Sequence, residues 1–316
     1  MNEDYIVTAM TSDGLFRVLA ARSTLTVEEG RRRHKTSRTA TAALGRVMTG
    51  AALMAATLDD DQSVTLRILA DGPSGGIIAE AANAGKEVRV RGYMGDPDAD
   101  LPPASEGKLD VGGLIGTDGY VHVLKDFGLG RPYTGSAKLQ SGEIAIDLAY
   151  YYTVSEQLPT AMALGVRLGG TRAGSGRGRW VTAAGGLMVQ VMPGRSPEES
   201  GDAIDSIQKN LAELGSISLR IQQGAEPEGL IQAALFGVAD VEIMSRLNLT
   251  FSCRCSRERA EATLMGLGKQ DLRNLSGEQE VTDVRCPFCN ESYSFSSREL
   301  IEIAEKAPDR SAKETP

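Results

Sequence analysis

Four cysteines in two close pairs constrain this chain more than any other feature of its sequence. Cys253 and Cys255 form a C-x-C pair, and thirty residues further on Cys286 and Cys289 form a C-x-x-C pair. Four thiolates complete a tetrahedral shell around zinc and leave no open position for a catalytic water. The spacing therefore predicts a closed site that holds one zinc ion per chain in the reduced protein. It gives no support to hydrolytic metal chemistry.

A closed four-sulfur site can be a permanent staple or a redox switch, and the residues leave both interpretations open. A C-x-C pair would form a cramped disulfide, and strained disulfides are the labile, regulatory ones. Arg254, Arg257 and Arg285 lie beside the cysteines in sequence and add positive charge, which favours the oxidisable thiolate. Because structural zinc contributes about 10 to 16 kcal/mol to the folding of a small module, we expect loss of the metal to unfold this one.

The residues from 1 to 194 alternate short apolar runs with glycine-rich turns, which predicts a mainly antiparallel sheet. Strands are expected within SDGLFRVLAA, SVTLRILADGPSGGIIAEA, KEVRVRGYM, GYVHVLKDF, GEIAIDLAY, TAMALGVRLGG and WVTAAGGLMVQVMPG. Between Ser37 and Leu58 apolar residues recur at helical spacing, which predicts a long helix packed on the sheet. A shorter helix is expected within DLAYYYTVSEQ. The predicted fold class is α+β, with a core domain at 1–194 and packed helices.

Residues 195–247 are expected to form a metastable helical linker, because nine acidic residues here outnumber four basic ones. A helix is predicted from Pro197 to Leu214, with a narrow apolar stripe on one side. Such a charged helix is stable only when it docks its stripe on another surface. Two shorter segments, SISLRIQQG and PEGLIQAALFG, follow and each ends at glycine. The predicted docking stripe consists of Ile204, Ile207, Leu211 and Leu214.

The last part of the chain is expected to be a small zinc-binding redox-switch domain at 248–306, followed by a disordered tail at 307–316. A helix-like segment, ERAEATLMGLGKQDLRNL, separates the two cysteine pairs. The other candidate ligands, His34 and His122, lie far away in sequence. A mixed shell would therefore form only if the fold returned one of them to the cysteines.

Composition and charge exclude several classes of protein. The chain is 41% hydrophobic and 24% charged, as expected of a globular protein, and lacks an apolar run of about eighteen residues that could cross a bilayer. Its N-terminus, MNEDYIVTAMTSDG, has acidic residues where a secretory signal has basic ones. A formal net charge of −8 opposes contact with nucleic-acid phosphates unless basic residues gather on one face. We expect a cytoplasmic protein with no membrane and no nucleic-acid partner.

Two other functions are compatible with parts of the sequence. The C-P-F-C motif is that of a thiol oxidoreductase, but such a motif should open a helix early in a βαβ unit. A nucleic-acid-binding zinc ribbon would use the RRRHK run at 31–35 and the arginine-rich loop at 171–180. A solvated charge run at the approach to a helix is the better explanation of RRRHK, and a mobile hairpin tip is the better explanation of the loop.

Four longer segments, in the same order, carry a specific family resemblance beyond the cysteines. They are DLAYYYTVSEQLPTA, AAGGLMVQVMPG, FSCRCSRERAEATLMGLG and VRCPFCNESYSF. With the C-x-C and C-x-x-C pairs, the chain resembles the redox-regulated, thirty-three-kilodalton heat-shock chaperones of bacteria over nearly its whole length. The loop at 171–180 and the tail after Lys306 depart from that pattern.

The resemblance implies an ATP-independent holdase that is not an enzyme and that is inactive while reduced and zinc-bound. It maps the four cysteines onto the family's zinc ligands. It also implies that oxidation pairs Cys253 with Cys255 and Cys286 with Cys289, releases zinc and unfolds the linker. The reduced form is then expected to be a monomer, and the oxidised form a homodimer that binds unfolded or oxidatively damaged client proteins.

Overall fold

The computed structural model describes residues 3–105, 108–169, 179–193 and 197–308. The chain divides into two compact units, Met1–Ser252 and Cys253–Pro316. Nearly all of the arginine-rich segment 171–180 and of the tail 307–316 lies outside the described residues. Within the described ranges, no helix is both long and apolar enough to span a bilayer.

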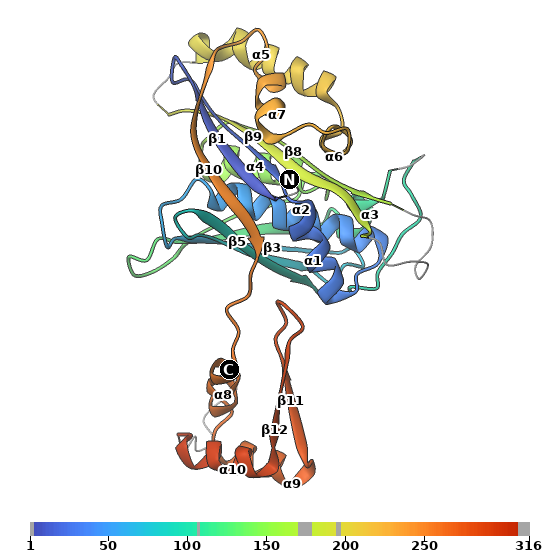
Figure 1. Ribbon diagram of the computed structural model, residues 1–316, viewed down its shortest axis with the longest axis vertical. Helices are drawn as coiled ribbons and strands as arrows, with labels where there is room; N and C mark the ends of the chain where they lie inside the picture. The colour runs from blue at the N-terminus through green and yellow to red at the C-terminus, as the bar shows by residue number, and fades with distance from the viewer. Residues whose placement is uncertain (1–2, 106–107, 170–178, 194–196, 309–316) are drawn as a thin grey trace. The chain divides into compact units, whose positions relative to one another are not determined.

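In the described residues, the larger unit is built on one sheet of ten strands. Figure 1 shows the sheet with helices packed on it. The strands are β1 (Tyr5–Thr11), β2 (Phe16–Arg22), β3 (Ser63–Ala70), β4 (Ile77–Asn83), β5 (Glu87–Met94), β6 (Gly119–Asp126), β7 (Tyr133–Lys138), β8 (Thr160–Leu168), β9 (Val181–Val191) and β10 (Val241–Phe251). Their order across the sheet is β7-β6-β3-β4-β5-β10-β1-β2-β9-β8. Neighbouring strands are antiparallel, except that β10 runs parallel to β5. The predicted, mainly antiparallel α+β fold is confirmed.

Four helices cover one face of the sheet and enclose the main hydrophobic core. They are α1 (Thr24–His34), α2 (Arg38–Ala55), α3 (Val111–Ile115) and α4 (Ala145–Ser155). The long helix expected near Ser37–Leu58 is α2, and the Ser37 side chain caps it by accepting a hydrogen bond from the Ala40 amide. Leu44 and Val47 of this helix are at most 2% exposed. Its apolar spacing therefore corresponds to burial against the sheet.

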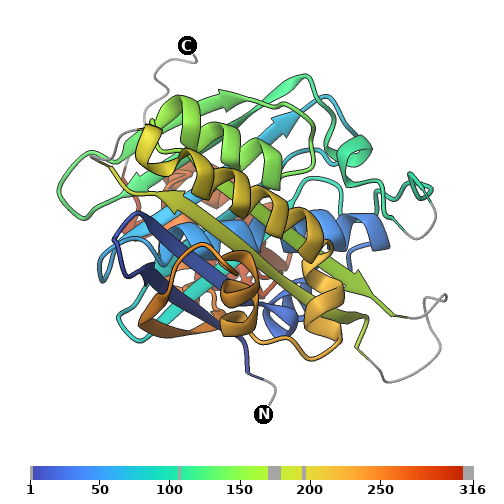
Figure 2. The same cartoon turned by 90° about the horizontal axis from the view of Figure 1, so that it is seen from above.

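Three helices cover part of the opposite face, over β1, β2 and β9 (Figure 2). They are α5 (Pro197–Leu214), α6 (Ile217–Gln222) and α7 (Pro227–Ala234). Successive residues of a strand point to opposite faces, so Val18 of β2 contributes to the core under these helices and Leu19 to the main core. The segment that we expected to be a helical linker is thus the second layer of the larger unit.

The boundary between the two units differs from the expected one. The predicted linker, 195–247, includes the start of β10, which pairs with β1 on one side and with β5 on the other. The division falls after Ser252 instead of after Leu247. Few side chains of β10 are buried, Leu247 and Leu249 among them. Buried and exposed residues alternate over only a few positions of β10. The sequence pattern therefore did not predict this strand.

Residues 142–150, expected as the strand GEIAIDLAY, mostly form the start of α4, so that prediction is wrong. The Asp147 carboxylate accepts hydrogen bonds from the backbone amides of Gln140, Ser141 and Ile144. Ile144 adopts a left-handed conformation with φ 64°, which turns the chain into the helix. Side-chain capping by one buried aspartate overrides the apolar alternation of the sequence.

The smaller unit contains three helices and a two-stranded hairpin. Its elements are α8 (Arg257–Met265), α9 (Lys269–Glu278), β11 (Val281–Arg285), β12 (Ser292–Ser296) and α10 (Ser297–Lys306). The prediction of a single helix between the cysteine pairs is wrong. Gly268 has a φ of 93°, which interrupts the helical conformation and separates α8 from α9. In the described residues its core is small, with eight buried side chains. They are Ala260, Leu264, Leu272, Phe295, Leu300, Ile303, Ala304 and Ala307.

Candidate metal centre

Cys253 and Cys255 lie in the segment between β10 and α8, which has no regular secondary structure. Helix α8 begins directly after them, because the Ser256 side chain accepts a hydrogen bond from the Arg259 amide. The sulfurs of both cysteines belong to one group whose ligand atoms lie within 4.8 Å of one another.

Cys286 and Cys289 lie in the tight turn that joins β11 to β12. The Cys286 amide donates to the Glu291 carbonyl over 2.9 Å, and the Asn290 amide donates to the Cys286 carbonyl over 2.9 Å. Asn290 takes the left-handed conformation, with φ 62°, that closes the turn. These backbone bonds fix both sulfurs on one side of the hairpin end.

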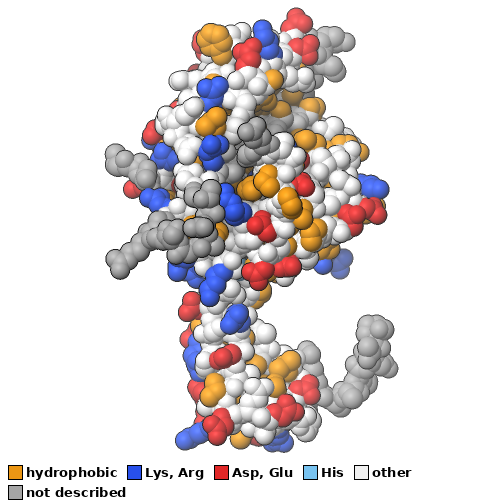
Figure 3. Space-filling view, turned by 90° about the vertical axis from the view of Figure 1, so that its right-hand side faces the viewer, with side chains coloured by type: hydrophobic (Ala, Val, Ile, Leu, Met, Phe, Trp, Pro, Cys, Tyr) orange, Lys and Arg blue, Asp and Glu red, His pale blue; other side chains and the backbone are white. Residues whose placement is uncertain are grey.

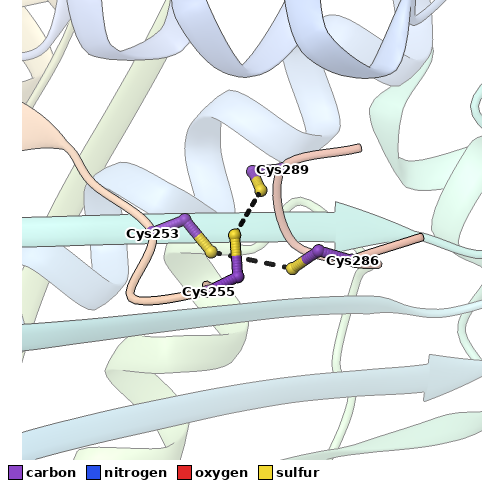
Figure 4. Close-up of side chains that lie close together, drawn as sticks. All are labelled: Cys253, Cys255, Cys286 and Cys289. Carbon is purple, nitrogen blue, oxygen red and sulfur yellow. Dashed lines mark hydrogen bonds between the residues drawn. The ribbon is translucent and has the colours of Figure 1, made fainter. Parts of the chain in front are cut away.

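The four sulfurs form one compact group within the smaller unit (Figure 4). Cys253 Sγ lies 3.7 Å from Cys286 Sγ, Cys255 Sγ lies 3.3 Å from Cys289 Sγ, and all four sulfurs lie within 4.8 Å of one another. Sulfurs bound to tetrahedral zinc at ~2.3 Å are about 3.8 Å apart. The group can hold a metal ion, and its size and its all-thiol donor set are compatible with zinc. Both histidines belong to the larger unit, and neither joins this group of described residues.

Burial changes the pKa values of the two thiols in the C-x-x-C turn. It raises the pKa of the Cys286 thiol and that of the Cys289 thiol above the ordinary cysteine value. Backbone amides of Phe288 and Cys289 act in the opposite direction on the pKa of Cys286, and the amide of Glu291 does so for Cys289. A metal ion that binds here must therefore displace protons, so its affinity falls as the solution becomes more acidic.

Two side chains support the C-x-C limb, and sequence analysis missed the first of them, Tyr293. The Tyr293 hydroxyl, from β12, donates a hydrogen bond to Cys255 Sγ over 3.2 Å. Arg257, at the start of α8, lies over the Phe295 ring at 4.3 Å and pairs with Glu299 at 2.7 Å. The only sequence signal for the contact between Tyr293 and Cys255 is a tyrosine four residues after the C-x-x-C motif. The contact itself becomes apparent only in the folded structure.

Two of the three arginines that lie beside the cysteines in sequence have polar partners. We expected Arg254, Arg257 and Arg285 to add positive charge, but the Arg257 guanidinium is paired with a carboxylate. Arg285 Nε donates to the Ser292 hydroxyl across the hairpin over 3.4 Å. Neither contact reaches a sulfur atom.

The C-x-x-C turn connects two antiparallel strands and does not begin a helix. A thioredoxin-like motif gains its reactivity from a helix N-terminus, which lowers the pKa of the first cysteine. Here burial raises the pKa of that cysteine, Cys286, instead. The geometry therefore favours metal binding over a dithiol oxidoreductase site.

The predicted docking stripe faces the sheet of the larger unit. Ile207 and Leu214 are buried, and Ile204 and Leu211 are partly buried beside them. The neighbouring core residues come from β1, β2, β9, α6 and α7. Asn210 adds a polar contact, because its side-chain amide donates to the Ala234 and Phe236 carbonyls over 3.0 and 2.9 Å.

The basic run at 31–35 is the end of α1, and its arginines have partners. Arg31 pairs with Glu28 at 2.8 Å, and Arg32 and Arg33 pair with Glu29 at 2.8 and 2.7 Å. Figure 3 shows one face of the larger unit, on which Lys and Arg are mixed with Asp and Glu. A phosphate-binding surface instead gathers cations on one face.

Fold and site together define a two-unit α+β protein whose small C-terminal unit contains a closed four-cysteine site. The family model described as Hsp33 protein matches residues 4–296. The chain therefore belongs to the Hsp33 family, and the resemblance inferred from its motifs is confirmed.

Curated relatives named 33 kDa chaperonin align with this chain over nearly their full length. The 33 kDa chaperonin of Symbiobacterium thermophilum is 45% identical, with 97% of this chain and 99% of the relative aligned. The 33 kDa chaperonin of Desulforamulus reducens is 41% identical, with 98% and 99% aligned. The crystal structure of a 33 kDa chaperonin from Thermotoga maritima matches with a TM-score of 0.84 at 35% identity, covering 96% of this chain and 99% of that one.

Proposed function

We propose that this protein is a cytoplasmic, ATP-independent chaperone that oxidation activates. In its reduced state the four cysteines hold one zinc ion and the protein is inactive. Oxidant converts the thiols to disulfides and releases the metal, and the protein then binds unfolding proteins. It has no enzymatic activity in this scheme.

The observation that carries this proposal is the group of four sulfurs in a unit with a very small core. Eight buried side chains are described in that core. About 10 to 16 kcal/mol from structural zinc is large compared with what so few side chains contribute. Bound zinc would thus supply most of the stability of the smaller unit, and its loss would unfold that unit.

Helices α5, α6 and α7 cover an apolar part of the sheet. Beneath them lie buried apolar side chains of the sheet, including Val7, Phe16, Val18 and Leu187. A large uncovered apolar surface is the kind of surface that binds unfolded chains. Undocking of the three helices would expose both this sheet face and their own stripe.

Strand β10 connects the helices α5, α6 and α7 to the four-cysteine unit, because it follows the helices and ends two residues before Cys253. We propose that unfolding after Cys253 removes a constraint on the docked helices, which leave the sheet. The oxidised chains then form a homodimer, whereas the reduced protein is a monomer. The partners are unfolded or oxidatively damaged client proteins, with no nucleic acid and no membrane among them.

Disulfide connectivity is a separate element of the proposal. We propose that Cys253 pairs with Cys255 and Cys286 with Cys289. Sulfur contacts of 3.7 and 3.3 Å join different motifs instead, but any pairing is within reach because all four atoms lie within 4.8 Å of one another. Disulfides within each motif would free the two limbs from each other, and this would unfold the unit more fully than cross-links would. Peptide mapping by mass spectrometry distinguishes these connectivities.

The decisive experiment follows zinc release and client aggregation in the same samples. Reduced full-length protein is incubated with peroxide at moderately raised temperature, with a zinc indicator present. Light scattering of a denaturing client is recorded without nucleotide. We expect one zinc per chain to be released and client aggregation to be suppressed only after release.

If the reduced and oxidised forms suppress client aggregation equally, the metal site is only a permanent structural site and not a switch. Reduced protein purified without metal but with an ordered C-terminal unit would overturn the proposal at its first step.

A further inference from the structure

We propose that Tyr293 is a positioning residue that slows the oxidation of Cys255 and thereby sets how readily the four-cysteine site opens. The inference rests on the proposed redox function. It adds a residue outside the ligand set that controls the rate of the switch.

The geometry places the tyrosine hydroxyl on one particular sulfur. Tyr293 Oη donates to Cys255 Sγ over 3.2 Å. Tyr293 lies opposite Val284 in the β11–β12 hairpin, and both side chains pack against the small core. Hairpin register therefore holds the hydroxyl in place from a strand that contains no cysteine.

At the C-x-x-C turn, the backbone amides of Phe288, Cys289 and Glu291 act to lower the pKa values of the Cys286 and Cys289 thiols. Those donors belong to the turn itself and remain whatever side chains are present. The donor to Cys255 is a side chain, so one substitution removes it.

A hydrogen bond to a thiolate engages a sulfur lone pair and reduces its nucleophilicity. One of the remaining sulfur lone pairs attacks peroxide, and the hydrogen bond makes it less reactive by withdrawing electron density from sulfur. In the attack, sulfur bonds to one peroxide oxygen, the O–O bond breaks, and the departing hydroxide takes up a proton to become water. The resulting sulfenic acid condenses with a neighbouring cysteine thiol, which forms the disulfide and releases a second water. One peroxide is reduced for each disulfide formed.

The test compares Tyr293→Phe with the wild type and with Ser294→Ala in the full-length protein. Phenylalanine keeps the ring in the core and removes only the hydroxyl. Ser294 lies next to Tyr293 on the same strand, and its hydroxyl donates to Asp283 over 2.6 Å, so Ser294→Ala removes a hydroxyl that does not contact a sulfur. Zinc release is measured under pseudo-first-order peroxide.

We expect Tyr293→Phe to release zinc roughly five-fold faster, the change in rate that corresponds to about 1 kcal/mol for one lost hydrogen bond, and Ser294→Ala to match the wild type. Cobalt loading gives an independent readout, because loss of a hydrogen bond to sulfur shifts the sulfur-to-cobalt charge-transfer band to lower energy. Incorporation of 4-aminophenylalanine at position 293, which restores a donor, should return both the rate and the band toward wild type.

Equal release rates and identical cobalt spectra for Tyr293→Phe and the wild type would overturn the inference. So would a Tyr293→Phe protein that cannot retain metal, because the hydroxyl would then be a requirement for the site. Failure of the proposed function looks different, since the wild type itself would then contain no zinc or release none with peroxide.

Discussion

The Tyr5 hydroxyl donates a hydrogen bond to Glu228 Oε2 over 2.9 Å and so joins the first strand of the sheet to the first turn of α7. Glu226, which precedes the helix, lies 3.2 Å from the same hydroxyl. Arg22 and Arg246 lie over the Tyr5 ring at 5.2 and 5.0 Å, and Arg246 also pairs with Glu228. One tyrosine thus organises two anions and two cations where the helical segment contacts the sheet.

We predict that Tyr5→Phe weakens the docking of α7 on the sheet. The ring contacts remain, but the bonds to Glu226 and Glu228 are lost, at a cost of about 1 kcal/mol because the site is partly exposed to solvent. Limited proteolysis of the reduced protein should show several-fold faster cleavage between residues 197 and 240. Tyr120→Phe, at a half-exposed position on β6, serves as the control. Unchanged cleavage would mean that the hydroxyl does not hold the helix.

A charge introduced into the docking stripe should release α5. Ile207 is 3% exposed, and the transfer of an unpaired carboxylate into such a site costs several kcal/mol, so Ile207→Asp is expected to undock the helix. Gln208→Asp adds the same charge at the exposed neighbouring position and should leave the helix in place. Amide hydrogen exchange of α5 reports docking directly. Client aggregation assays with reduced protein then show whether undocking alone activates the chaperone.

Removal of one ligand should unfold the smaller unit and leave the larger one intact. Cys286→Ser breaks the four-sulfur shell, and the remaining core of eight described side chains is too small to hold the unit. We expect the helical circular dichroism of α8, α9 and α10 to be lost, with no zinc bound. Asp283→Asn, in the same hairpin, should retain one zinc per chain. An ordered C-terminal unit in Cys286→Ser would contradict the role assigned to the metal.

The stability of the larger unit should depend on pH through Asp4. Burial raises the pKa of this carboxyl from 3.8 to about 6, although Asp4 accepts a hydrogen bond from the Thr26 amide at the start of α1. Since the folded state holds the proton more tightly, the contribution of Asp4 to stability falls as pH rises from about 4 to about 6. The shift of about two units corresponds to roughly 3 kcal/mol at most.

Asp4→Asn should therefore raise the free energy of unfolding at pH 7 and change it little at pH 4. An asparagine oxygen can still accept from the Thr26 amide, so the helix start is retained. Guanidinium unfolding of both proteins at the two pH values measures the difference. A stabilisation that is equal at both values would assign the effect to something other than ionisation of Asp4.

Sequence reasoning found the features that depend on local spacing. Helix α2 was predictable because apolar residues recur at helical intervals between Ser37 and Leu58, and the cysteine spacing indicated one metal site. The first residues of α4 were not predictable, because a single carboxylate, Asp147, collects three amide donors that lie up to seven residues upstream. Strand β10 was missed because few of its side chains are buried.

The contacts that support the site depend on pairing between distant segments. Tyr293 of β12 reaches Cys255 across 38 positions of sequence. Tyr5 reaches Glu228 across 223 positions of sequence. No local pattern encodes either contact, so only the folded structure identifies these two tyrosines.

The strands on either side of α5, α6 and α7 in the sequence belong to the same sheet. Strand β9 ends at Val191 before these helices, and strand β10 starts at Val241 after them. If they leave the sheet, they do so as a closed loop whose two ends stay anchored in strands. Such a loop gains less conformational entropy than a chain with a loose end, and its return needs only a local search. Repeated cycles of release and recapture therefore require neither strand to dissociate.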